Sequence, residues 1–292
     1  MRSVLASLTC IWAFTGALLA ADEPISLRYK FVEGQVIRYS VAMQDDYDIT
    51  VALANDKPST SQESGKQFRV IKVHSDGSAD LELMLEWVKM SVTSSGQTIS
   101  FDSRKQEKDI DPSFGPVADM LGKPHVRVTA ATNGQLSNVQ LLIGDKDQPN
   151  EISKGALDAF VTLPSEPVAV GTSWREDFTV PVPVTEKLSK SIKLQRRFYL
   201  QSADNGQAVI TFETKILSPV NDPDEEIQLI RRPTKGTLVL DLDRGVMLEK
   251  TTTLDNTVVN FGGVASTMTL KQNHKEKIVA EQIASSDASS PK

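Results

Sequence analysis

The stretch IRYSVAMQDDYDITVAL, residues 37–53, decides the fold class of this chain. Every second residue in it is apolar, and only Asp45 interrupts the row. The apolar members are Ile37, Tyr39, Val41, Met43, Tyr47, Ile49, Val51 and Leu53. A period of two indicates a β-strand, here roughly 50–60 Å long at about 3.3 Å per residue. Strands this long are typical of tall curved sheets and open barrels, because ordinary strands have about 5–6 residues.

The same alternation recurs along the chain. It is found in residues 79–87, 192–200, 208–216, 238–242 and 247–261. Turn dipeptides that accept a positive φ separate the runs: Asp76-Gly77, Ser95-Gly96, Asn133-Gly134, Asn205-Gly206 and Gly262-Gly263. The sequence therefore predicts a mainly β protein, α+β at the margin, built as a long-stranded antiparallel meander in a curved sheet or open barrel.

Two short helices are expected within this sheet protein. Asp111 or Ser113 caps the first, which covers Phe114 to Leu121 and ends at Gly122. The second covers residues 150–160 and belongs to a helical connection, residues 150–162, that stops at Pro164. The tail, residues 285–292, is rich in Ser, Ala and Asp and is expected to be disordered.

Similar phrases in the two halves of the chain suggest an internal duplication. Val32-Glu33-Gly34 compares with Ala169-Val170-Gly171, and each glycine opens a strand. The repeat halves would be residues 25–145 and 165–280, within one β-rich domain of residues 21–284. The alternative is that any two β-meanders look alike, and the sequence leaves both possibilities open.

Residues 1–20 have the features of a secretory signal peptide. Arg2 supplies the positive charge, and the apolar stretch to Ala20 is shorter than a membrane span of about 20 residues. Cys10, the only cysteine, lies inside this leader. Cleavage would leave a cysteine-free chain, which excludes disulfides, thiolate catalysis and cysteine-bound metals. We expect export to a bacterial periplasm or to the exterior, and the sequence does not separate the two.

The charge of the chain argues against several partners. The formal net charge is −6. An acidic protein has no electrostatic reason to bind nucleic acid or anionic membranes. After the leader, no stretch approaches 18 uninterrupted apolar residues, so no transmembrane segment is expected.

No constellation of residues predicts catalysis, a cofactor or a metal. The three histidines, His74, His125 and His274, are far apart and are expected at the surface or at hairpin ends. No GxSxG motif is present, and Pro124 rules out a phosphate loop at residues 115–123. The sequence therefore predicts no catalytic, cofactor-binding or metal-binding residues.

Ordinary structural roles explain the other candidate residues. A β-turn explains Asp241-Leu242-Asp243-Arg244-Gly245 more simply than a calcium loop. Solvated loops explain the acidic residues Asp222, Asp224, Glu225, Glu226, Asp145 and Asp147, and a solvated strand face explains Asp80, Glu82 and Glu86. Trp87 continues the row of Leu81, Leu83 and Leu85 and is expected in the core, and Trp174 is expected to pack where the halves meet.

The order of these elements resembles a family of exported bacterial proteins of unknown function. The resemblance rests on Leu27-Arg28-Tyr29-Lys30-Phe31-Val32-Glu33-Gly34, on Leu163-Pro164 with Pro167-Val168 and Gly171-Thr172-Ser173-Trp174, and on the hairpin Asp241 to Gly245. It covers most of the chain and implies an exported β-rich domain without a known activity. The architecture is also similar to bacterial lipoprotein carriers, whose curved sheet and short helices surround a hydrophobic cavity.

Three functions follow as hypotheses. The first is an exported, non-enzymatic protein that binds an apolar or lipid-like ligand inside the sheet, against the helices near Phe114 and Phe160, which requires a real cavity. The second is a structural or protein-interaction module of the periplasm or cell surface without a cavity. The third is a hydrolase whose site the sequence does not reveal, so enzymatic activity is left open.

Overall fold

The computed structural model describes residues 23–105, 110–143, 160–185 and 188–283. It is 62% strand and 6% helix, which places the protein in the mainly β class. The strands are β1 (Gln35–Val51), β2 (Ala54–Asp56), β3 (Ser59–Val73), β4 (Ala79–Ser94), β5 (Gln97–Asp102), β6 (Pro124–Ala130), β7 (Leu136–Leu141), β8 (Ser173–Thr185), β9 (Leu188–Asp204), β10 (Gln207–Ile216), β11 (Lys235–Asp241), β12 (Val246–Val259) and β13 (Thr267–Ile283). The helices are a 3₁₀ turn (Pro112–Phe114), α1 (Gly115–Met120) and α3 (Pro223–Gln228).

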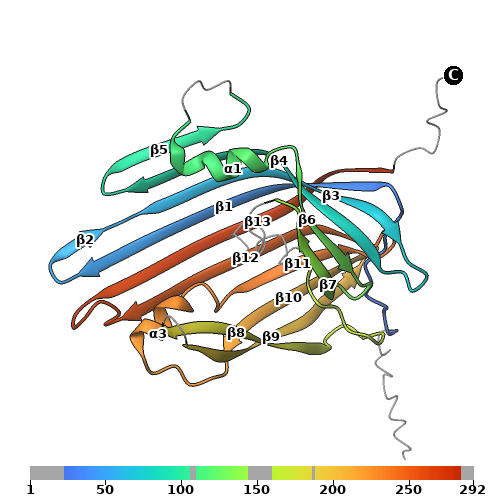
Figure 1. Ribbon diagram of the computed structural model, residues 1–292. Helices are drawn as coiled ribbons and strands as arrows, with labels where there is room; N and C mark the ends of the chain where they lie inside the picture. The colour runs from blue at the N-terminus through green and yellow to red at the C-terminus, as the bar shows by residue number, and fades with distance from the viewer. Residues whose placement is uncertain (1–22, 106–109, 144–159, 186–187, 284–292) are drawn as a thin grey trace, which may run out of the picture.

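All 13 strands belong to one antiparallel sheet (Figure 1). Its order is β7-β6-β4-β3-β1-β13-β12-β11-β10-β9-β8, with β2 beside β1 and β5 beside β4. The chain thus runs outward from β1 to β7 and returns from β8 to β13. Because β1 and β13 pair along almost their full length, only the seam between β7 and β8 keeps the meander from being a closed barrel.

Two non-strand segments fill this seam at one end of the sheet. Residues 25–31 and residues 160–168 both bond to the turn between β6 and β7, and they bond to each other through Ile25 and Val168. The backbone bonds that hold them are Ile25 to Val168, Tyr29 N–H to the Thr132 carbonyl at 2.7 Å, Leu163 N–H to the Asn133 carbonyl at 2.8 Å and Lys30 N–H to the Gly245 carbonyl at 3.0 Å. We call this end the closed end, and the opposite end, where β1 and β12 finish, the open end.

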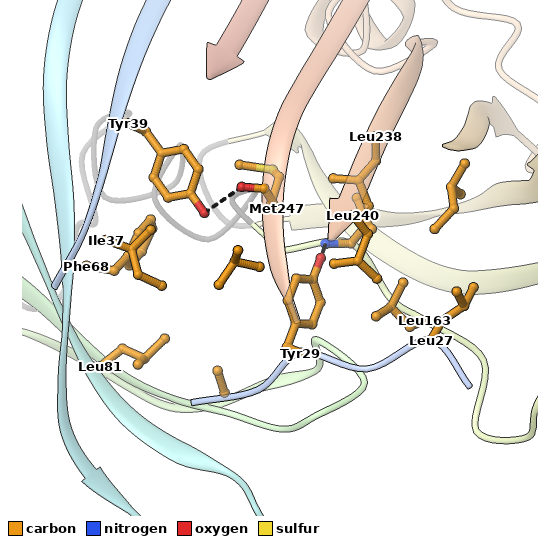
Figure 2. Close-up of a cluster of buried hydrophobic side chains, with 14 of the residues drawn as sticks. Leu27, Tyr29, Ile37, Tyr39, Phe68, Leu81, Leu163, Leu238, Leu240 and Met247 are labelled. Atoms are coloured by element: carbon orange, nitrogen blue, oxygen red, sulfur yellow. Dashed lines mark hydrogen bonds between the residues drawn. The ribbon is translucent and has the colours of Figure 1, made fainter. Parts of the chain in front are cut away.

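The main hydrophobic core lies at the closed end, around Tyr29 (Figure 2). Its members come from strands as far apart in the sheet as β6 (Val126) and β9 (Phe198), so the sheet curves around the filling segments. Phe160 packs edge-on against Tyr29, with ring centroids 5.0 Å apart, and against Phe68, at 5.5 Å. A hollow of about 20 Å³ remains beside Tyr29, which is space for about one water.

The structure confirms the predicted strand architecture and the first helix. β1 is a single strand of 17 residues with one bulge at Arg38/Tyr39. Asp111 caps the turn before α1, since its carboxylate accepts the Ser113 N–H at 2.9 Å. The predicted leader, the helix at residues 150–160 apart from Phe160, Asp145, Asp147 and the tail lie outside the described residues. α3 was not predicted. The possible duplication stays a prediction.

The expectation for Trp87 was wrong, and a β-bulge is the reason. The pairing of β3 with β4 shifts between Gly65 and Lys66, which inserts one extra residue into β4 before Trp87. Trp87 therefore turns to the outer face, where it covers Gly65. The Arg104 guanidinium lies over the indole at 4.3 Å from the ring centroid.

The closed end predicts a specific stability hierarchy. Tyr29 is 2% exposed and its hydroxyl accepts the Val161 N–H at 3.2 Å. We expect Tyr29→Ala to lower the free energy of unfolding by about 3–5 kcal/mol, since it empties the seam. Tyr29→Phe should cost about 1–3 kcal/mol, because the Val161 N–H loses its acceptor. Urea unfolding followed by tryptophan fluorescence measures both.

The matched control for this prediction is Tyr199→Ala, because Tyr199 is 44% exposed. Its effect should stay within about 0.5 kcal/mol. Equal effects of the two alanine variants would contradict the role given to the seam.

Candidate functional site: the inner face of the sheet

The inner face is the side of the sheet that carries the core. One row of side chains crosses its middle, from strand to strand: Met90 (β4), Gln62 (β3), Met43 (β1), His274 (β13) and Thr252 (β12). All five are half-buried. We call this set the central row. It separates the filled closed end from the open half of the inner face.

A buried ionic cluster lies next to the central row on the side of the closed end. The Glu276 carboxylate is 1% exposed and lies 2.8 Å from the Lys66 ammonium. Lys250 is directly opposite Glu276 in the register, and His274 lies 3.4 Å away.

These cations determine the protonation state of Glu276. Burial alone would raise its pKa, but Lys66 and Lys250, and then His274, lower the pKa to about 2. The carboxylate is thus charged at neutral pH although it is buried. Two lysines, Lys66 and Lys250, thus act on one buried carboxylate.

A second ionic group joins the inner face to the α3 segment. Asp45, the residue that interrupts the apolar row of β1, is 1% exposed. Its carboxylate lies 2.7 Å from the Arg231 guanidinium and accepts a hydrogen bond from Gln272 at 2.8 Å. Arg231 also donates to the Tyr47 hydroxyl. These bonds hold the loop that follows α3 on β1 and β13.

The two short helices form walls on the inner face. Phe114, just before α1, stacks on Phe101 of β5 with ring centroids 5.7 Å apart. On the other side, Ile230, just beyond α3, packs with Leu254 and Leu270 of β12 and β13. Between them, β1 and β3 present Met43, Gln62 and other half-buried side chains. We call this strip, with the central row, the inner trough; Figure 1 shows the strands that form it.

The structure places the three histidines in three different settings. His74 lies at the β3–β4 hairpin, 3.2 Å from Asp80, as expected. The surface expectation was wrong for the other two. His274 faces inward on the central row. His125 is 1% exposed, and this burial lowers its pKa.

The other acidic candidates have structural partners. Glu82 pairs with Arg127, Glu86 with Arg38 and Asp80 with His74 and Thr129, all on the outer face of β4. Asp241 accepts the N–H groups of Asp243 and Arg244, which confirms the β-turn. Asp222 to Glu226 form the start of α3 instead of the expected loop, and Glu225 is buried against Lys190 at 2.6 Å.

Two further observations concern sites of other kinds. Among the described residues, no group of three or more His, Cys, Asp or Glu side chains could hold a metal. A hollow of about 180 Å³ lies on the outer face between β3, β4 and β5. Glu63 and Asp102 line it together with Lys89 and Lys105, so its charges balance and select no ion.

The sequence did not reveal Lys66, Lys250 and Glu276 as a cluster. One signal was available in β13, where the inward row reads Leu270, Gln272, His274, Glu276 and Ile278. A polar stretch between two apolar ends on the inward side of a strand indicates a polar belt inside the sheet. Its partners on β3 and β12 follow only from the strand register.

The fold places the chain among proteins built on large curved antiparallel sheets. No family model and no curated protein matches it. Among solved structures it is similar to lipovitellin, in a structure on lipid–protein interactions in lipovitellin, with 11% identity and a TM-score of 0.52 over 89% of this chain. The chain spans 27% of that lipovitellin chain. This likeness shows a shared fold.

A second solved structure is a β-barrel-like protein of the domain of unknown function DUF1849 from Brucella abortus. It matches at 8% identity over 89% of this chain and 100% of its own, with a TM-score of 0.22. A similarity this low carries no argument. In the part of the chain that the structure describes, no helix has the length and apolar character of a membrane span.

The ionic cluster predicts the acid sensitivity of the fold. The pKa of Glu276 is about 2 in the folded protein and 4.5 in the unfolded chain. Its charged form therefore stabilises the fold fully above pH 4.5, and this stabilisation is lost as the pH falls toward 2. Glu276→Gln should remove this dependence. At pH 7 it should also cost about 3–5 kcal/mol, because the buried lysines lose their counter-charge. Denaturant unfolding at pH 7 and pH 3 measures both effects.

The control is Glu249→Gln. Glu249 pairs with Lys275 at 2.9 Å in an exposed ion pair on the same two strands. Its loss should cost less than about 1 kcal/mol. If the two variants lower the free energy of unfolding equally, the buried cluster contributes no more to stability than an ordinary ion pair.

His125 predicts a separate loss of stability at mildly acid pH. The folded protein holds its pKa below the usual 6.5, so the unfolded chain binds the proton first as the pH falls. Stability is full above pH 6.5 and decreases below it, by up to about 1.4 kcal/mol per pH unit. His125→Leu should abolish this slope between pH 7.5 and 5.5, with His74→Leu as the control for loss of a histidine. An unchanged slope in His125→Leu would refute the assignment.

Proposed function

We propose that this chain is an exported, non-enzymatic binding protein of the periplasm or exterior that holds an apolar or lipid-like molecule in the inner trough. The observation that carries the proposal is the central row. Met43 and Met90 are apolar, unbranched and half-buried at the middle of a wide sheet, where methionine adapts its shape to varied partners. The lipid-carrier-like fold supports the same conclusion.

The proposed place differs from the one expected from the sequence. Phe160 packs into the core against Tyr29 and Phe68, and Phe114 stacks on Phe101. The closed end is filled by the chain itself, with a hollow of about 20 Å³ beside Tyr29. An acyl chain does not fit there. The ligand therefore lies in the open half, on the trough between α1 and the α3 segment.

The polar members of the trough favour an amphipathic ligand. Gln62, Thr252 and His274 offer hydrogen-bonding groups beside Met43 in the same row. The ionic cluster of Glu276, Lys66 and Lys250 lies one row deeper. A ligand with an apolar tail along the methionines and a neutral or acidic head over this belt fits both features. Burial of its tail would contribute about 25 cal/mol per Å².

The alternative is a structural or protein-interaction module of the envelope. The chain-filled closed end favours it, since it leaves no enclosed cavity there. Membership in the family of exported bacterial proteins that the sequence resembles is compatible with both functions. The two are separated by whether the isolated protein carries a small molecule.

Native mass spectrometry on protein exported with its own leader and purified without detergent tests the proposal. We expect extra mass in lipid-sized steps, or uptake of a fatty acid added in excess. Met43→Gln should weaken this uptake about fivefold, because it places an amide on the trough floor, at a cost on the order of 1 kcal/mol.

The matched control is Met84→Gln. Met84 is also half-buried on a strand, but it faces outward between the inward residues Leu83 and Leu85. It should leave uptake unchanged. A clean mass for the wild-type chain, before and after incubation with lipid, would favour the interaction module.

A further inference from the structure

Two hairpins at the open end have tips that are apolar and uncharged. The β1–β2 tip contains Val51, Ala52 and Leu53, and the β12–β13 tip contains Val259 and Val264 among its residues. No charged residue occurs in residues 49–55 or 256–270. The tips are neighbours, since β1 pairs with β13 up to Thr50 and Thr267, and a Cβ on Gly262 would lie 3.8 Å from Val51. We call them the apolar tips.

The outermost side chains of the apolar tips, Leu53 and Val264, project into solvent. Leu53 is 102% exposed and Val264 is 94% exposed, and Val51 and Val259 are 40% and 50% exposed. The hairpins at the closed end are different, because Asp76-Gly77, Asn205-Gly206 and Asp243-Arg244-Gly245 form their turns. Polar turns are the ordinary solution for a hairpin in water. The open end thus concentrates exposed apolar side chains where the chain elsewhere places polar ones.

The backbone of the tips reinforces this contrast. Ala52 has φ 54° and Ala265 has φ 65°. Glycine or asparagine takes this left-handed conformation at lower cost, as Asn205-Gly206 does at the closed end and as Asn260 and Gly263 do elsewhere in the β12–β13 tip. Two alanines in this conformation, beside Leu53 and Val264, keep the tips apolar at the expense of backbone strain.

We propose that the apolar tips dock on the surface of a zwitterionic phospholipid bilayer, with Leu53 and Val264 inserted among the lipid headgroups. A protein partner requires a contact of about 800 Å² on each side, and two narrow hairpin tips offer little of it. A fluid bilayer surface accepts such projections, and apolar groups enter it to a depth of about 5–10 Å.

The charges behind the tips fit this depth. Asp56 is three residues from Leu53, which is about 10 Å at about 3.3 Å per residue. Behind the tips the charges form pairs, Lys57 with Asp48 at 2.9 Å and Lys271 with Asp255 at 3.8 Å. They would remain at the level of the headgroups. Since these pairs are balanced and the net charge is −6, attraction to anionic lipid is not the driving force.

Flotation with phosphatidylcholine vesicles tests the docking. We expect the wild-type protein to float with the vesicles equally in 0.1 M and 0.5 M salt, because the contact is apolar. The double variant Leu53→Asp with Val264→Asp should bind at least tenfold more weakly. Val279→Asp is the matched control, because Val279 is 67% exposed near the closed end, and it should float like the wild type. Intact mass and circular dichroism confirm that all variants share one N-terminus and one fold.

A reporter variant gives an independent measurement. The tryptophan in Leu53→Trp should shift its emission to the blue and be quenched by brominated phosphatidylcholine. The proposal is overturned if the wild-type protein stays with the buffer, or if the aspartate variant floats as well as the wild type. It is also overturned if light scattering shows a dimer that only the aspartate variant disrupts and no vesicle binding occurs, since the tips would then contact a second copy. Neither outcome depends on a ligand in the inner trough, so this inference and the proposed function fail separately.

Discussion

The open seam between β7 and β8 is the constraint on which the rest of the structure depends. A 13-stranded meander whose first and last strands pair has two free edges, and each presents unpaired backbone groups. At the closed end, Tyr29 and Leu163 belong to segments that bond to the turn beside β7, and Val168 to the N-terminal segment. Along β8, Pro181 and Pro183 remove N–H donors from the strand. The chain therefore protects its edges by filling one end of the sheet, and this filling leaves only the open half for the ligand that we propose.

The sequence predicts those parts of the fold that depend on local alternation. The row from Ile37 to Leu53 predicts β1, because alternating side chains point to opposite faces of a strand. The turn at Asn205-Gly206 predicts the β9–β10 hairpin, because both residues accept a positive φ. The seam could not be predicted in this way. Tyr29 meets Val161, which is 132 residues away, and no local pattern encodes this pairing. Trp87 shows a different limit of local patterns. The apolar alternation up to Trp87 is regular, but one extra residue in the pairing of β4 with β3 turns the Trp87 side chain to the outer face.

The candidate site was hidden for the same reason. Lys66, Lys250 and Glu276 lie on three strands, and each alone reads as an ordinary charged residue on a solvated face. Only the pairing of β13 with β12, and the proximity of β3 across β1, brings them together. Asp45 was visible as a break in an apolar row, but Arg231, its partner, comes from a loop whose path the sequence does not define. A site that depends on strand register cannot be predicted from the periodicity of one strand.

The ionic cluster acquires a physical meaning from its position between the two halves of the inner face. A buried ion pair contributes little net stability, because desolvation of the charges offsets their attraction. A purely apolar interior would therefore serve the fold as well, and Leu81, Leu238 and Leu240 provide such an interior toward the closed end. Glu276 and its cations lie where this filling stops and the methionines of the trough begin. For the amphipathic ligand that we propose, a charged belt at that boundary would define how deep the molecule lies, since its tail is favoured along the methionines and its head at the charges.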